Sequence, residues 1–157
     1  MKRRLVALGL LLAFTSETVV WAGLNSKKAM YVGGTIPSLT QGIEGTASAQ
    51  DEKIFVFEYK GGKLSIPYDK INDLEYGEKA GRRLGLAIVV SPLFLFSKKK
   101  KHFLTLGYTD DKDKQEAGVF ELGKDVIRVT LASLEARTGR KVDYQDEEAR
   151  KDGLGGS

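Results

Sequence analysis

The chain has 157 residues, of which 41% are hydrophobic, 25 are basic and 21 are acidic, giving a formal charge of +4. This length and hydrophobic content predict one domain with a packed core and exclude a wholly disordered chain. Because the sequence contains no cysteine and one histidine, it excludes disulfides, cysteine nucleophiles, thiolate-bound metal or haem, and a metal site with two histidines from one chain.

Residues 1–22 have the pattern of a cleavable secretory signal peptide. A basic head precedes the apolar run from Leu5 to Phe14, and Val20 and Ala22 occupy the −3 and −1 positions of a cut after Ala22. The run is shorter than the roughly 20 residues that cross a bilayer, although an uncleaved N-terminal anchor shares the pattern. We therefore expect an exported protein, periplasmic or secreted, that can be peripheral to a membrane.

Cleavage of this leader changes the charge balance. It removes three of the 25 bases and one of the 21 acids, so the formal charge falls from +4 to +2. The basic character of the whole chain thus belongs in part to the leader. A nucleic-acid partner is not expected on this ground.

The remaining basic residues are concentrated in one stretch, residues 79–101, which we call the basic-flanked segment. It contains no acid and seven bases, namely Lys79, Arg82, Arg83, Lys98, Lys99, Lys100 and Lys101. Between the two basic groups, the thirteen residues from Leu84 to Phe96 carry no charge. Such a run needs either a protein core or an apolar surface outside the molecule.

Two environments remain open for the uncharged run. As a single helix it would extend about 20 Å against a hydrocarbon thickness of about 30 Å, and Pro92 disfavours a helix across its middle. An interfacial hairpin would insert apolar side chains and hold basic ones at lipid phosphates, which assigns insertion to Leu93, Phe94, Leu95 and Phe96 and phosphate contacts to Arg82, Arg83, Lys98, Lys99, Lys100 and Lys101. Alternatively, 84–90 and 93–96 are two buried elements of the core with solvated basic flanks.

The predicted domain spans residues 23–142, and outside the basic-flanked segment its sequence indicates short strands followed by one helix. Alternating, aromatic and β-branched residues indicate strands over 30–36, 53–60, 63–67, 71–76, 103–108 and 117–122. A further strand of small and polar residues is expected over 42–50. Asp125 to Thr138 carries apolar residues at spacings of 4, 3 and 4 before Gly139, which predicts an amphipathic helix. The charged residues 143–157 predict a disordered tail. The expected fold is therefore mainly β with one C-terminal α-helix.

This order of elements resembles the pleckstrin-homology-like superfold, including its bacterial and GRAM-type members. The stretch from Gly61 to Ile71 looks like the family's step from one sheet to the next, and Phe120 to Leu134 is similar to its last strand and capping helix. The resemblance implies an antiparallel β-barrel or sandwich of about seven strands capped by a helix, as in small exported bacterial proteins of unassigned function. The apolar insertion between the fifth and sixth strands departs from the family pattern, so no binding residue is transferred.

The sequence shows no pattern typical of an active site. His102 follows four lysines with no adjacent acid, so we expect a surface or interfacial residue rather than a general base. Ser65, Ser91 and Ser133 lack the glycine frame of a nucleophile elbow. We expect no catalytic residue, no metal ligand and no small-molecule cofactor.

These observations together predict a non-enzymatic binding module. The basic-flanked segment would associate with an anionic membrane surface or an envelope component. The alternative is a protein–protein interaction or assembly module whose apolar run packs on a partner chain. Exposure of 84–96 in the folded protein would favour either role over a core role.

Overall fold

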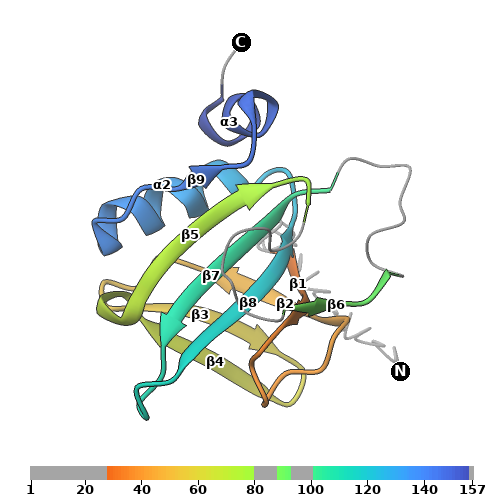
Figure 1. Ribbon diagram of the computed structural model, residues 1–157, viewed down its shortest axis with the longest axis vertical. Helices are drawn as coiled ribbons and strands as arrows, with labels where there is room; N and C mark the ends of the chain where they lie inside the picture. Colours follow the sequence, from red (N-terminus) through yellow and green to blue (C-terminus); the bar gives the residue numbers. More distant parts are fainter. Residues whose placement is uncertain (1–27, 80–87, 93–100, 156–157) are drawn as a thin grey trace, which may run out of the picture.

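A computed structural model describes residues 28–79, 88–92 and 101–155 (Figure 1). Its elements in chain order are β1 (Lys28–Gly34), β2 (Ile43–Ser48), β3 (Ile54–Tyr59), β4 (Gly62–Pro67), the 3-10 helix η1 (Tyr68–Lys70), β5 (Ile71–Gly77), β6 (Val89–Val90), β7 (Phe103–Thr109), β8 (Gln115–Leu122), α2 (Ile127–Thr138), β9 (Asp143–Tyr144) and α3 (Glu147–Leu154). The prediction of a mainly β fold with a helix near the C-terminus is confirmed. The signal peptide predicted for 1–22 lies outside the described residues.

The strands form one bent sheet in the order β4-β3-β2-β1-β8-β7-β5-β9, with β6 added beside β1. Neighbouring strands are antiparallel except β5 and β9, which are parallel. Figure 1 shows β3 and β4 crossing behind β5, β7 and β8, so the sheet folds over itself in two layers. Within the described ranges, the end strands β4 and β9 do not pair with each other, so the closed barrel form of the expectation is not observed.

Aromatic side chains fill the space between the two layers. Phe120 of β8 packs against Phe55 and Phe57 of β3, with ring centroids 5.8 Å and 5.1 Å apart, and against Tyr31 of β1 at 5.7 Å. All four side chains are buried, whereas Val56 between the two phenylalanines is only half-buried. This alternation is the pattern from which β3 was predicted, because successive side chains point to opposite faces of a strand.

Helix α2 covers one open end of the bent sheet (Figure 1). Ile127, Leu131 and Leu134 are buried against the core at the predicted spacing, with Thr130 beside them. The helix ends where Gly139 adopts a positive φ of 69° and donates its N–H to the Glu135 carbonyl at 3.0 Å. Glycine adopts this left-handed geometry without a Cβ clash, so the predicted stop at Gly139 is confirmed.

The C-terminal residues 143–155 differ from the expected disordered tail, because they form β9 and α3. Asp146 caps α3 by accepting a hydrogen bond from the Ala149 N–H at 2.8 Å. Gly153 allows close packing, since a Cβ there would lie 2.5 Å from the Tyr144 ring. The charged composition of this stretch therefore belongs to the solvated face of a capped helix.

Candidate functional site

Nine of the ten residues predicted to contact lipid or a partner lie outside the described residues. They are Arg82, Arg83, Leu93, Phe94, Leu95, Phe96, Lys98, Lys99 and Lys100. The tenth, Lys101, places its Nζ 2.8 Å from Glu121 Oε2 on β8, with 18% of its side chain exposed. A lipid phosphate would have to compete with Glu121 for this ammonium group.

The middle of the basic-flanked segment forms strand β6. Val90 and Val89 pair with Gly33 and Gly34 of β1 in an antiparallel register. The approach requires glycine, because a Cβ on Gly33 would lie 2.3 Å from the Val89 carbonyl oxygen. The Gln41 side chain adds a second attachment by donating to that carbonyl at 2.7 Å and accepting from the Ser91 N–H at 3.2 Å.

Strand β6 divides its apolar side chains between the protein and the solvent. Ile88 and Val90 pack against a small outer cluster of Val32, Phe103 and Val119, separate from the main core. Val89 between them is 64% exposed. The described part of the uncharged run is thus neither wholly core nor wholly surface.

The start of the basic-flanked segment is held by Gln145, which follows β9. Gln145 Oε1 accepts from the Lys79 N–H at 3.0 Å, and Nε2 donates to the Lys79 carbonyl. The same Nε2 donates to Glu75 Oε1 at 2.7 Å, on a side chain that is 1% exposed. Residues 75–79 are therefore bound to the C-terminal part of the chain.

The end of the segment leads into a buried polar contact. His102 is 8% exposed, and its Nδ1 lies 2.7 Å from the Tyr76 hydroxyl of β5, with the two rings parallel within 4°. Burial raises the pKa of Tyr76, so the hydroxyl stays protonated and available for this hydrogen bond. The expectation of a surface position for His102 is wrong, because its ring lies buried against Tyr76 just before strand β7 begins.

A polar cavity of about 240 Å³ opens beside His102 and is lined by His102, Lys124, Asp125, Ile127, Arg128 and Asp152. Arg128 also donates to the Asp152 carbonyl at 3.3 Å, which links α2 to α3. The lining brings carboxylates near the histidine but includes no hydroxyl or thiol that could act as a nucleophile. The sequence offered no signal for this cluster, since its members lie 22 to 50 positions from His102.

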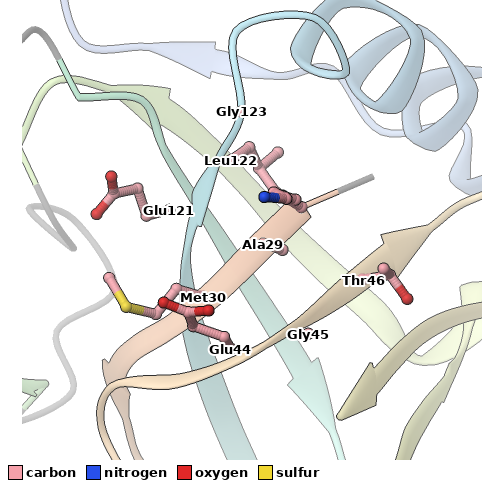
Figure 2. A pocket seen from close by; sticks show the side chains of 9 residues that line it. Ala29, Met30, Glu44, Gly45, Thr46, Glu121, Leu122 and Gly123 are labelled. Carbon is pink, nitrogen blue, oxygen red and sulfur yellow. The ribbon is translucent and has the colours of Figure 1, made fainter. Parts of the chain in front are cut away.

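A larger open groove, of about 540 Å³, runs over strands β2, β1 and β8 (Figure 2). Its lining comprises Lys28, Ala29, Met30, Glu44, Gly45, Thr46, Glu121, Leu122 and Gly123. Met30 pairs with Glu44 on one side and Glu121 on the other, and Figure 2 shows the three side chains gathered at one end. An anionic headgroup would meet two carboxylates there, so the groove itself suits lipid phosphates poorly.

A second buried carboxylate, Glu116 on β8, belongs to a structural network rather than to a cavity. It accepts a hydrogen bond from the Thr35 hydroxyl and from Lys114 Nζ, the latter at 2.6 Å. The pKa of Tyr108 is raised to about 12, mainly by burial and further by the Glu116 charge. These contacts tie the β7–β8 hairpin to the loop after β1.

No protein-family model matches the chain, and no curated protein is significantly similar to it. In the part of the chain that the structure describes, no three His, Asp or Glu side chains are grouped so that they could hold a metal ion. No helix within 28–79, 88–92 or 101–155 is both long and apolar enough to span a bilayer. The charges and contacts of the chain itself are therefore what indicates its function.

Proposed function

We propose that the protein is an exported, non-enzymatic binding module that associates with an anionic membrane surface through residues 79–101. The observation that carries the proposal is the concentration of seven bases and no acid around an uncharged run. The described middle of that run is attached to β1, with Val89 exposed. An attached strand has less conformational freedom to lose when the segment binds a charged surface.

The expected electrostatic free energy is large enough for binding to an anionic membrane surface. A base near an anionic bilayer contributes about 1 kcal/mol, so several bases acting together give several kcal/mol before any apolar insertion. Because Lys101 is bound to Glu121, we assign the phosphate contacts chiefly to Arg82, Arg83 and Lys98–Lys100. Insertion of Leu93–Phe96 would add the hydrophobic term.

For the finer fold we propose a pleckstrin-homology-like architecture with an open sheet. Two observations support it: seven strands in the expected order, and a helix packed across one end of the bent sheet. Strands β6 and β9 and helix α3 are additions to that plan. The likeness supports a binding role only in general terms, since one fold serves many functions.

The alternative is an assembly module in which the apolar run packs on another chain. The exposed Val89 on β6 favours this alternative, since an apolar side chain at a strand edge can be covered by a partner. Salt separates the two functions. Contacts to lipid phosphates weaken as ionic strength rises, whereas apolar packing does not.

Co-sedimentation with lipid vesicles tests the proposal. The chain from Gly23 onward should be recovered with vesicles containing phosphatidylglycerol and much less with phosphatidylcholine alone. Changing Lys98, Lys99 and Lys100 to Gln removes three bases and should weaken binding by about two orders of magnitude, at about 1 kcal/mol for each base.

The matched control removes the same charge elsewhere. Lys60, Lys63 and Lys112 are exposed and lie outside the segment, so their replacement by Gln should leave most of the binding intact. Equal recovery with both vesicle types, or equal weakening by both triple variants, would contradict the proposed function.

A further inference from the structure

We infer that Gln145 is a positioning residue for the basic-flanked segment, and that residues 143–155 thereby control how this segment leaves the sheet. The inference rests on the proposed function, because it concerns the presentation of the same bases. The residues that support it, Glu75, Tyr76, Lys79, His102 and Gln145, all lie in the described part of the chain.

Gln145 continues the hydrogen bonding to the chain of β5 beyond the end of the short strand β9. Strand β9 pairs with β5 only at Glu75 and Tyr76, and the Gln145 N–H continues the pairing by donating to the Tyr76 carbonyl at 3.0 Å. Beyond that point its side-chain amide takes over, since Oε1 accepts from the Lys79 N–H at 3.0 Å while Nε2 donates to the Lys79 carbonyl. One side chain therefore fixes the backbone two residues after β5 ends at Gly77.

Gly77 and Glu75 both favour this position of the Gln145 side chain. A Cβ on Gly77 would lie 2.1 Å from Gln145 Oε1, so the side chain occupies space that glycine leaves free. The buried Glu75 carboxylate accepts from Gln145 Nε2 at 2.7 Å. A carboxylate that is 1% exposed requires hydrogen bonds, which makes this orientation of the amide strongly preferred.

Tyr76 connects Tyr144 to His102, the residue that follows the other end of the basic-flanked segment. The Tyr76 hydroxyl lies 2.7 Å from His102 Nδ1, one residue after Lys101, while its ring meets that of Tyr144 edge-on at 6.0 Å. Tyr76 therefore contacts residues 143–155 through its backbone and ring, and the residue that directly follows the basic-flanked segment through its hydroxyl. Displacing residues 143–155 would loosen Lys79 and His102 together.

The experiment measures amide hydrogen exchange of Lys79 and affinity for phosphatidylglycerol vesicles in the same variants. In Gln145→Ala the Lys79 N–H loses its acceptor, and we expect exchange at least tenfold faster and vesicle binding at least threefold weaker. Arg150→Ala, which removes an exposed pair with Glu147 on α3, is the control and should change neither.

A side-chain exchange distinguishes positioning from a general loss of stability. Gln145→Glu alone places two carboxylates together and should resemble Gln145→Ala. Adding Glu75→Gln restores a donor between positions 75 and 145 and an acceptor for the Lys79 N–H, but the Lys79 carbonyl still lacks its side-chain donor. The double variant should therefore recover part of the slow exchange and part of the binding.

The outcomes are separable from those of the proposed function. If the unaltered protein does not bind vesicles, the proposed membrane function fails, while Lys79 exchange still tests whether Gln145 orders the start of the segment. If the protein binds and Gln145→Ala binds equally well, the inference is overturned, whatever happens to Lys79 exchange.

Discussion

Several buried polar side chains in this protein each bridge two elements that are distant in the sequence. Tyr76 joins β5 to the start of β7 through His102, and Glu116 joins β8 to the loop after β1. Buried polar groups contribute about 1 kcal/mol when their hydrogen bonds are made and cost more when a partner is removed. Substitutions at such residues should therefore also disturb the element on the other side of the hydrogen bond.

Tyr76→Phe removes the hydroxyl that contacts His102 while keeping the ring. We expect the free energy of unfolding to fall by about 1–3 kcal/mol, because a buried imidazole nitrogen loses its hydrogen bond. Urea unfolding followed by circular dichroism measures the change. Tyr59→Phe, on a half-buried residue of β3, should have a smaller effect; equal effects would contradict the assigned contact.

Two aspartates, the exposed Asp51 and the half-buried Asp110, make stability depend on pH. Backbone N–H groups of Lys53 and Ile54 lower the pKa of Asp51, and those of Lys114 and Lys112 lower the pKa of Asp110. A lowered pKa means that the folded protein binds the proton less readily than the unfolded chain. The stabilisation is complete above the ordinary pKa of about 4 and is lost as pH falls through the lowered value.

The urea midpoint should therefore decrease between pH 6 and pH 3. In the double variant Asp51→Asn, Asp110→Asn the decrease should be smaller, since neither position can then bind a proton. Asp111→Asn removes one negative charge from the same exposed turn and should leave the pH dependence nearly unchanged. A double variant with the full pH dependence of the unaltered protein would show that other groups cause it.

At the scale of elements, helix α2 shows how one apolar stripe closes the bent sheet. Leu134 is fully buried on the face toward the core, whereas Val129 on the opposite face is 64% exposed. Through Arg137 the helix also contacts the β2–β3 loop and η1, because Arg137 donates to the Gln50 carbonyl at 3.1 Å and lies over the Tyr68 ring. Burial of the stripe, rather than helix propensity alone, stabilises α2.

Leu134→Ala should lower the free energy of unfolding by about 2–5 kcal/mol, through lost burial and the cavity left behind. Val129→Ala removes a similar apolar side chain from the exposed face and should change stability by less than about 0.5 kcal/mol. Thermal or urea unfolding of the two variants measures the difference. Comparable losses would mean that α2 does not pack as described.

At the scale of the whole molecule, opposite charges are segregated. With the leader removed, the formal charge is +2, yet residues 79–101 alone carry seven bases and no acid. The remainder is therefore net acidic, so an anionic surface would attract one region and repel most of the rest. This asymmetry predicts an oriented association through the basic-flanked segment.

Vesicle binding should weaken strongly as salt increases from 0.1 M to 1 M, because the screening length falls from about 10 Å to about 3 Å. Equilibrium binding to phosphatidylglycerol vesicles at the two salt concentrations measures the effect. Binding that is unchanged or stronger at high salt would favour apolar packing on a partner chain instead.

Much of the secondary structure was predictable because it depends on neighbours within a few residues. The alternation of apolar residues in β3 and the spacing of Ile127, Leu131 and Leu134 in α2 each indicate which face is buried. Helix α3 was missed because only Ala149 and Gly153 of its residues are buried, which leaves almost no apolar period to detect. Its capping residue, Asp146, was the available signal.

The sequence by itself determined the order of strands and helix and the placement of seven bases around an uncharged run. Only the tertiary structure decided that His102 is buried against Tyr76, that Lys101 meets Glu121, and that Gln145 holds Lys79. Local propensity acts over a few residues, whereas these contacts join positions 20 to 66 apart. Their geometry depends on strand register and on the bend of the sheet, which no local pattern encodes.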